Sequence, residues 1–524
     1  MPRHTDPCTP IEAREIESWY AETDVLVVGY GGAGSCAALE AESRGADVIL
    51  LEVASAGGGT TSMSGGQIYL GGGTPLQQAC GFSDTPEDME AYIRIAAGTN
   101  ADADKIHAYC SESIEHFEWL VSRGVVFNPE YYGGKHTNTP EYQSLSWSGN
   151  EKGFLESRAA RPAPRSHKPK AFWEDGGATL MATLRTAVER TKVRVEVDTR
   201  ASTLIRDGGR IVGALCRHAG EWRAFRARRG VVLACGGFVM NRDMVAKYAP
   251  RLVDGTPLGS AHDEGSGILM GIGAGGAAIN MSEGFISVIW YPDGIFCEGV
   301  FVNEQGNRFV NEDCYHARGG HHCLNQSSRR AYMVVDSRIY TKPPLYSAAQ
   351  VKEVGETFEE LERGAGFPAG TLSATMATYN RFAARGEDPL FHKHRDFLRP
   401  LDQPPYALLD FSIESGIYYP TFTLGGLDTT IDGEVRTPTG EKILGLYAAG
   451  RTAAGLPAAA KVMRAGCRWA TRPSSGGARD GRRPPPRGLR RPRPSAIPST
   501  GNPLLVHGPA RSSSGDPRVG RDVD

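Results

Sequence analysis

The sequence lacks a strong excess of either charge, and it lacks long apolar runs. Its 524 residues carry a formal net charge of -2, so the charge balance does not point to nucleic acid or to an anionic membrane. No run approaches the ~20 apolar residues that a membrane span requires. Residues 1–20 have no apolar core of the kind found in secretory signals. We therefore expect a cytoplasmic protein with no nucleic-acid partner and no membrane span.

Paired cysteines are missing as well. The ten cysteines are scattered from Cys8 to Cys467, and no two of them form a C-x-x-C pair. This spacing argues against zinc and iron–sulfur sites and against a disulfide scaffold. One segment could still suggest a metal because it mixes cysteine with histidine: Cys314, His316, His321, His322 and Cys323. We interpret that segment as a polar loop with incidental thiols, and we expect no metal site.

Glycine, in contrast, is abundant, with 65 residues. Abundant glycine suits a fold in which the backbone approaches a ligand closely at many points. The most informative stretch lies near the N-terminus. There the pattern predicts a short buried strand over residues 24–29, a helix over 33–44 and a second apolar strand over 47–51. Together these elements predict a βαβ unit of about 30 residues.

A glycine fingerprint joins the first strand of this unit to its helix. Gly29, Gly31 and Gly34 match G-x-G-x-x-G, and an acidic residue follows at the end of the second strand. Such glycines allow a tight turn, let a pyrophosphate approach the backbone, and bring helix and strand together. The helix N-terminus attracts the phosphates, and the acidic residue is placed to bind the adenosine ribose. The predicted dinucleotide contacts are Gly29, Gly31, Gly32, Ala33, Gly34 and Glu52.

The residues after Glu52 favour FAD over NAD. A run rich in Gly, Ser and Thr follows at once, over residues 57–66, where NAD-binding units do not usually have one. Such a run offers a bulky isoalloxazine ring backbone donors and small side chains. Two later strands, which lead into residues 234–237 and 446–450, also end in small residues. We therefore predict FAD as the cofactor. Its further predicted contacts are Gly58, Gly59, Thr60, Thr61, Ser64, Gly65, Gly66, Ala201, Ala234, Gly236 and Gly450.

The rest of the pattern predicts how the chain is divided. Helical spacing is found over residues 86–123 and again over 356–385, and the sequence past Gly237 is less regular and richer in aromatic residues. We predict an α/β protein in which a Rossmann-like FAD-binding domain of the GR2 type is interrupted by a smaller α+β substrate or cap domain. The predicted pieces are an N-terminal extension (1–22), the first segment of the FAD-binding domain (23–280), the cap domain (281–404), the second segment of the FAD-binding domain (405–462) and a disordered tail (463–524).

In this order, the motifs resemble those of the fumarate reductase and succinate dehydrogenase flavoprotein superfamily. The resemblance runs from about Thr23 to Val462. Besides the fingerprint with its acidic residue, the segments that carry it are 57–66, 232–238, 302–312 and 445–450. Within the superfamily the chain is most similar to 3-ketosteroid dehydrogenases, especially the type that desaturates 5α-reduced 3-ketosteroids.

The finer resemblance depends mainly on residues 310–316, Val-Asn-Glu-Asp-Cys-Tyr-His, where Tyr315 aligns with a catalytic tyrosine of that branch. Residues 422–427 are also similar to a family segment that lines the flavin and the substrate. The resemblance implies an apolar, steroid-like substrate that loses two hydrogens from adjacent carbons beside a ketone. One hydrogen leaves as a proton with the help of the tyrosine, and the other as a hydride to the flavin. The external electron acceptor is left open.

Two alternatives stay open beside this interpretation. Fumarate reductases use an arginine as acid, and Arg318 is the candidate for that role here. The second interpretation is therefore an enoate reductase of the fumarate type. The third is a catalytically impaired remnant, because the C-terminus departs from the family.

The family ends with a helix that begins under the flavin, in a pattern similar to Lys-Val-Tyr-Ala-Ser-Gly-Leu-Ser-Leu-Gly-Asp-Ala-Thr-Phe-Phe-Gly. This chain continues from Lys461-Val462 into a stretch dominated by Arg, Pro, Gly and Ser. Codons allowed for residues 463 onward, read in a shifted frame, spell Ala-Ser-Gly-Leu-Ser-Leu-Gly-Asp-Ala-Thr-Phe-Phe-Gly. One base lost near Val462 explains the change, so we interpret residues 463–524 as an out-of-frame tail. Met463 and Ala465 then stand where the steroid branch has an active-site Tyr and Ser.

We predict that this tail is unstructured and that the chain as written is impaired. The tail has too few apolar residues to offset an ordering entropy of ~1–2 kcal/mol per residue. Loss of the family's helix also removes its N-terminal N–H groups from the flavin. Restoring one base near the codon of Val462 should therefore raise the flavin content and the rate of steroid-dependent flavin bleaching. Equal flavin content and equal rates in the two proteins would show that the tail is native.

Overall fold

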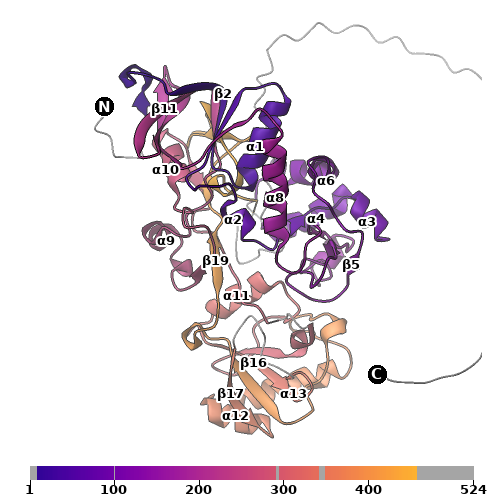
Figure 1. The fold of residues 1–524 in the computed structure, drawn as a ribbon. Helices are drawn as coiled ribbons and strands as arrows, with labels where there is room; N and C mark the ends of the chain where they lie inside the picture. Colours follow the sequence, from indigo (N-terminus) through magenta and orange to yellow (C-terminus); the bar gives the residue numbers. More distant parts are fainter. Residues whose placement is uncertain (1–8, 99–100, 291–293, 341–348, 457–524) are drawn as a thin grey trace, which may run out of the picture. The chain divides into compact units, whose positions relative to one another are not determined.

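The computed structural model describes residues 9–98, 101–290, 294–340 and 349–456 (Figure 1). All of them belong to one compact unit that spans Met1–Gly476. The predicted tail over 463–524, and the last residues of the second predicted FAD-binding segment, lie outside the described residues. Within the described ranges, no helix combines the length and the apolar character that crossing a membrane requires.

A large mixed sheet forms the centre of the predicted FAD-binding domain. Its strands are β1 (Ile11–Glu12), β2 (Ala21–Val28), β3 (Val48–Leu51), β8 (Arg194–Glu196), β9 (Thr199–Asp207), β10 (Arg210–His218), β11 (Glu221–Leu233), β21 (Glu434–Arg436) and β22 (Lys442–Ala448). The order is β1-β9-β10-β11-β2-β3-β8, and β22 pairs with β11 and with β21. The pairs β8-β3, β3-β2, β2-β11 and β11-β22 are parallel, whereas β9-β10 and β10-β11 are antiparallel.

Alternating side chains of β2 are buried in two different clusters. Val25 and Val27 pack with residues of the helices α1 (Gly32–Ser43) and α8 (Gly176–Glu189). Leu26 and Val28 belong to a second cluster, together with residues of β9, β10 and β11. Successive side chains of a strand point to opposite faces, so the sheet is covered on both sides. Helices α1 and α8 lie side by side over one face (Figure 1). The α/β fold and the N-terminal βαβ unit are therefore confirmed.

The long helical stretch predicted over residues 86–123 consists of three helices. They are α4 (Pro86–Ala97), α5 (Ala103–Ser111) and α6 (Ser113–Ser122). Helix α4 ends at Gly98, whose φ of 91° takes the chain out of the helical region. The side chain of Asp102 then caps α5 by accepting hydrogen bonds from the N–H groups of Asp104 and Lys105. The apolar spacing was interpreted correctly, but these local breaks were missed.

Two short helices and a small sheet complete this region of the chain. The helices are α3 (Pro75–Ala79) and α7 (Glu156–Ala159), and the sheet is formed by β4 (Ile68–Tyr69), β7 (Ser166–His167), β6 (Leu145–Ser146) and β5 (Tyr131–Tyr132) in that order.

Another sheet and three α-helices lie in the predicted cap segment, except for one strand, β18, which follows its predicted end at residue 404. The sheet has the order β15 (Val300–Asn303), β16 (Ala331–Asp336), β18 (Tyr406–Asp410) and β17 (Gln350–Gly355), and the helices are α11 (His316–Leu324), α12 (Phe358–Ala365) and α13 (Thr371–Ala383).

Several pairings cross the predicted domain limits. Strand β18 pairs with both β16 and β17, so the cap sheet continues past the predicted limit at residue 404. Strand β14 (Gly284–Ile286) pairs with β19 (Pro420–Thr423), which joins the start of the predicted cap to the second predicted FAD-binding segment. At the N-terminus, β1 pairs with β9, so the predicted extension contributes to the large sheet. These limits depend on long-range pairings, which the local pattern does not contain.

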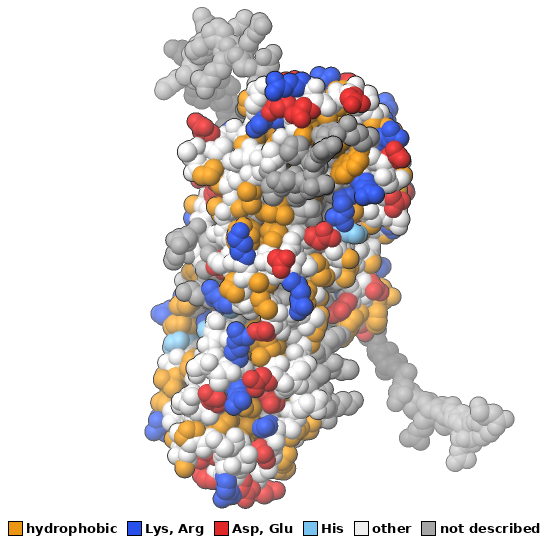
Figure 2. Space-filling model, turned by 90° about the vertical axis from the view of Figure 1, so that its left-hand side faces the viewer, with side chains coloured by type: hydrophobic (Ala, Val, Ile, Leu, Met, Phe, Trp, Pro, Cys, Tyr) orange, Lys and Arg blue, Asp and Glu red, His pale blue; other side chains and the backbone are white. Residues whose placement is uncertain are grey.

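Charges are mixed over the surface. On the face shown in Figure 2, basic and acidic side chains are interspersed instead of gathered by sign. This distribution agrees with the small net charge.

A buried ionic network stabilises the segment that precedes α11. The Glu312 carboxylate lies 2.7 Å from the Arg308 guanidinium and 3.0 Å from Nζ of Lys393, and Arg308 also contacts Asp388 at 2.9 Å. The side chains of Glu312 and Lys393 are fully buried. Burial by itself raises the pKa of Glu312, but the charges of Arg308 and Lys393 outweigh it and hold that pKa below its usual range.

Because the carboxylate has a lower pKa in the folded state, its contribution to stability is present above the usual glutamate pKa of about 4.3. It is lost as the pH falls through the folded-state value. Glu312→Gln should lower the free energy of unfolding at pH 7 by about 3–5 kcal/mol, because it leaves the buried Lys393 without its carboxylate partner and Arg308 with Asp388 alone. Chemical denaturation at pH 7 and at pH 4 measures both effects. Glu414→Gln, in an exposed pair with Arg330, is the control and should cost no more than about 1 kcal/mol. Equal losses in the two variants would contradict the prediction.

Candidate active site

The glycine fingerprint packs the first turn of α1 against the ends of two strands. A Cβ on Gly34 would lie 1.8 Å from the carbonyl oxygen of Gly29. A Cβ on Gly29, which has a φ of +104°, would lie 2.5 Å from the carbonyl oxygen of Ala234. Only glycine fits either position. This close contact fixes where the N-terminus of α1 lies relative to the ends of the two strands.

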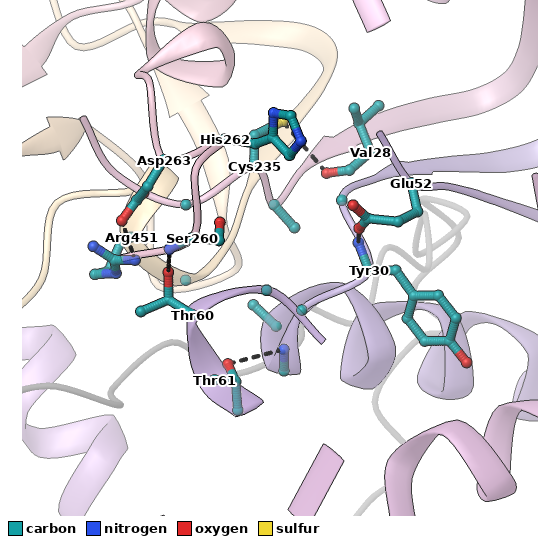
Figure 3. Close-up of a pocket in the computed structure, with 18 of the residues that line it drawn as sticks. Val28, Tyr30, Glu52, Thr60, Thr61, Cys235, Ser260, His262, Asp263 and Arg451 are labelled. Carbon is teal, nitrogen blue, oxygen red and sulfur yellow. Dashed lines mark hydrogen bonds and ion pairs between the residues drawn. The ribbon is translucent and has the colours of Figure 1, made fainter. Parts of the chain in front are cut away.

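The carboxylate of Glu52 lies at the end of β3 and is almost fully buried. It accepts hydrogen bonds from the N–H of Tyr30, at 2.7 Å, and from the N–H of Ala54, at 2.9 Å. These bonds fix the orientation of the carboxylate, whose oxygens can each accept a further hydrogen bond. The predicted ribose-binding residue is therefore held rigidly beside the glycine fingerprint (Figure 3).

The short helix α2 (Gly59–Ser62) forms another wall of the same space. The hydroxyl of Thr61 accepts a hydrogen bond from the N–H of Gly32, at 3.2 Å, and that of Thr60 accepts one from the N–H of Ser260, at 3.0 Å. The Gly-, Ser- and Thr-rich run is thus tied both to the N-terminus of α1 and to a loop that lies about 200 residues further along the chain.

A pocket opens between these elements (Figure 3). The structure brings most of the predicted cofactor residues to its wall. Those that line it are Gly29, Gly31, Gly32, Ala33, Glu52, Gly59, Thr60, Thr61, Ser64, Ala201, Ala234, Gly236 and Gly450.

Four predicted cofactor residues do not line the pocket: Gly34, Gly58, Gly65 and Gly66. Gly34 serves the helix–strand contact described above. A Cβ on Gly66 would lie 2.2 Å from the backbone of Gly176, and one on Gly65 would lie 2.3 Å from the side chain of Asn138. These two glycines allow close packing against α8 and against a loop.

The sequence analysis missed several polar residues of the pocket. Arg200 on β9 forms an ion pair with Glu264 at 3.1 Å, and Asp263 forms one with Arg451 at 2.5 Å. The other residues that were missed include Thr199, Cys235, Ser260, His262 and Ser266. One available signal was position, since Cys235 and Arg451 directly follow small residues that end predicted strands.

Neither predicted catalytic residue lines this pocket. Tyr315 is buried at the N-terminus of α11 in an apolar cluster with Phe285, Ala317 and Leu424, against which Phe422 packs. Phe422 and Leu424 line the pocket as well. Tyr315 is therefore separated from the pocket wall by one layer of side chains. Arg318, half-buried, lies on the first turn of α11.

Polar contacts from distant segments hold the backbone around Tyr315. Its N–H donates to Oδ1 of Asn150 at 2.5 Å, and Nζ of Lys135 donates to the carbonyl oxygen of Asp313 at 2.8 Å. The next residue, His316, contacts the hydroxyl of Ser287 through Nδ1 at 2.5 Å. The segment that carries the tyrosine is thus anchored on both sides.

This arrangement of pocket and fold matches a known family. The FAD binding domain family matches residues 24–462. The chain belongs to this family. Its cofactor is FAD, and it falls among FAD-dependent oxidoreductases that act on CH–CH groups. The donor set fits that cofactor: a helix N-terminus for the pyrophosphate, Glu52 for the ribose, and an apolar side for the flavin.

Several relatives catalyse related reactions. The solved structure of a 3-ketosteroid-Δ4-(5α)-dehydrogenase from Rhodococcus jostii RHA1, in complex with 4-androstene-3,17-dione, is 39% identical with a TM-score of 0.84, and the match covers 89% of this chain and 98% of that one. A 3-oxo-5-alpha-steroid 4-dehydrogenase of Comamonas testosteroni is 27% identical over 84% of this chain and 94% of its own length. A probable fumarate reductase of Shewanella frigidimarina is 28% identical over 83% and 70%.

Gly31 offers a direct test of the cofactor site. A Cβ at this position would meet no atom closer than 4.0 Å, and the φ of -87° suits any residue. Gly31→Asp should therefore fold. It should weaken FAD binding by about tenfold or more, because unit charges ~4 Å apart repel by about 1 kcal/mol in bulk water and about 4 kcal/mol near a protein surface. Fluorescence titration with FAD measures the loss, and circular dichroism checks the fold.

Gly31→Asn is the matched control, since it adds the same shape without the charge. It should bind FAD more tightly than Gly31→Asp. Normal FAD affinity in Gly31→Asp would place the pyrophosphate elsewhere.

Proposed function

We propose that this chain is a FAD-dependent 3-ketosteroid dehydrogenase that removes hydrogens from two adjacent carbons beside the ketone, in the 5α-reduced series. The observation that carries the proposal is the match to the steroid-bound Δ4-(5α)-dehydrogenase at 39% identity and a TM-score of 0.84, over nearly the whole of that protein. The apolar surroundings of Tyr315 support it independently.

The side chains between Tyr315 and the pocket suit a flat apolar substrate. Phe285 and Phe422 stack with their ring centroids 4.5 Å apart and their planes 15° from parallel. Leu424 and Ala317 complete the cluster. An apolar wall of this kind stabilises a hydrocarbon skeleton by burial and offers a dicarboxylate no compensating partner.

The chemistry needs one group of this chain beside the carbonyl. When a ketone is polarised, the proton on the neighbouring carbon becomes acidic. The hydroxyl of Tyr315 is suited to either task, since it can donate a hydrogen bond to the carbonyl oxygen or, as phenolate, take the proton. Its backbone is fixed by Asn150, which limits the positions that the phenol can reach. FAD, when bound, accepts the second hydrogen as a hydride.

The fumarate reductase relatives support a second reaction, the addition of hydrogen to a double bond beside a carbonyl. Arg318 follows Tyr315 by three residues, within the first turn of α11, and would supply the proton in that case. We propose no specific electron acceptor. We also propose a cytoplasmic location.

The role of Tyr315 can be tested with the flavin as reporter. In a protein whose reading frame is restored after Val462, Tyr315→Phe should slow flavin reduction by a 3-ketosteroid by at least about a hundredfold, the low end for general acid–base catalysis. Anaerobic stopped-flow absorbance measures the rate, and flavin content should be unchanged. Fumarate added to the reduced enzyme should not reoxidise the flavin.

The matched control is Tyr142→Phe, at an exposed tyrosine, which should leave the rate unchanged. If Tyr315→Phe also reduces at the normal rate, Tyr315 has no role in the chemistry. If fumarate reoxidises the flavin, whereas no steroid reduces it, the second reaction is the correct one.

A further inference from the structure

An ion pair of opposite charges lies in the wall of the FAD pocket. Nη2 of Arg451 is 2.5 Å from Oδ2 of Asp263. The Asp263 side chain is 1% exposed and that of Arg451 is 20% exposed. Arg451 directly follows Gly450, at the carboxyl end of β22, and Asp263 comes from the loop before α10 (Ser266–Gly273). Both side chains line the pocket (Figure 3).

The pair is incompletely satisfied. Oδ2 of Asp263 is held by the ion pair. Oδ1 of Asp263 and Nη1 of Arg451 are buried as well, and among the described residues neither has a hydrogen-bond partner. Buried polar atoms in native proteins nearly always have a partner, and a desolvated ion pair is stabilising only when its remaining donors and acceptors are bonded. The remaining acceptor of Asp263 and donor of Arg451 are therefore available to a molecule that binds in the pocket.

The pair lies toward the reacting end of that pocket. Glu52 marks the side expected for the adenosine, and the N-terminus of α1 the place expected for the pyrophosphate. In Figure 3, Asp263 and Arg451 lie across the pocket from Glu52, beyond Thr60. Cζ of Arg451 is 5.8 Å from the ring centroid of Phe422, which also packs against the Tyr315 cluster. Arg451 thus lies where the cofactor pocket meets the apolar cluster.

We propose that Arg451 raises the reduction potential of the bound FAD and that Asp263 limits this effect. A hydride carries two electrons and one proton, so its transfer from the substrate adds one negative charge to the flavin. A nearby guanidinium stabilises that charge, and a carboxylate beside it opposes the stabilisation. The proposal requires that FAD is bound. It rests on the proposed function only for the position of the reacting end of the pocket.

A second arginine of the pocket provides the matched control. Arg200 also lines the pocket, with His262 at 3.0 Å and Glu264 at 3.1 Å from its guanidinium. It follows Thr199, whose N–H donates to the carbonyl oxygen of Glu52, so it belongs to the adenosine side. Arg200→Gln therefore removes the same charge from the adenosine side of the pocket.

The experiment compares the affinities of the full-length protein for oxidised and for reduced FAD under anaerobic conditions. By a thermodynamic cycle, the dissociation constant of oxidised FAD divided by that of reduced FAD gives the shift in reduction potential on binding. A larger ratio corresponds to a higher potential of the bound FAD. Arg451→Gln should weaken reduced FAD more than oxidised FAD, and should lower the ratio by about tenfold, or about 30 mV for a two-electron couple. Asp263→Asn should raise the ratio. Arg451→Lys, which keeps the charge, and Arg200→Gln should leave it unchanged.

Two results would overturn the proposal. If Arg451→Gln weakens both forms equally, Arg451 only holds the cofactor in place. If Asp263→Asn lowers the ratio, or if Arg200→Gln changes it as much as Arg451→Gln does, the charges do not act on the flavin as proposed. None of these readouts uses a steroid. A failure of steroid to bleach the flavin would therefore contradict the proposed substrate and leave this inference standing.

Discussion

The rest of the site depends on a close backbone contact at the end of β2, where Gly29 meets the carbonyl oxygen of Ala234 at the end of β11 and offers its own carbonyl oxygen to the first turn of α1. That contact exists because Gly29 and Gly34 have no Cβ, and either Cβ would overlap a backbone oxygen. The contact fixes the position of the α1 N-terminus, and the neighbouring walls are then attached to it. The N–H of Tyr30 orients Glu52, and the N–H of Gly32 holds Thr61. A change in this one contact would displace the acidic residue and the Gly-, Ser- and Thr-rich run together.

Sheet topology explains why residues so distant in the sequence share one pocket. Strands β3, β2, β11 and β22 are neighbours and run parallel. Their carboxyl ends, which lead to Glu52, Gly29, Ala234 and Gly450, therefore lie along a single edge, where ligands of open α/β sheets bind. The antiparallel strands β9 and β10 bring residues 199–201 to the same pocket. The catalytic candidate Tyr315 lies outside this pocket, at the N-terminus of α11.

The features of the fold and of the site that could be predicted are those whose sequence signal lies within a short stretch of the chain. The βαβ unit, the fingerprint and Glu52 were predictable because strand, turn, helix and acid follow one another within about 30 residues. Asp263 and Arg200 could not be predicted as pocket residues, because their position beside the pocket depends on the long-range pairing of strands. The same limit explains why the predicted cap domain ends at residue 404, before the strand Tyr406–Asp410 that pairs with the rest of its sheet. Gly65 and Gly66 show another limit: a glycine in a sequence does not reveal whether the space it leaves serves a ligand or a neighbouring helix.

The polar contacts around Tyr315 join segments that are far apart in the sequence, and they affect how a substrate could enter. Lys135 and Asn150 bond the backbone at Asp313 and Tyr315, which lie 178 and 165 residues further along the chain. These bonds restrict the movement of the backbone around Tyr315, and with it the positions that the phenol can reach. The steroid that we propose as substrate is rigid, however, so it cannot change its shape to reach the site. Any movement that separates the Tyr315 segment from Lys135 and Asn150 must either break these bonds or carry the tyrosine with it. If the proposed substrate enters by such a movement, the frequency of that opening would limit the rate of turnover.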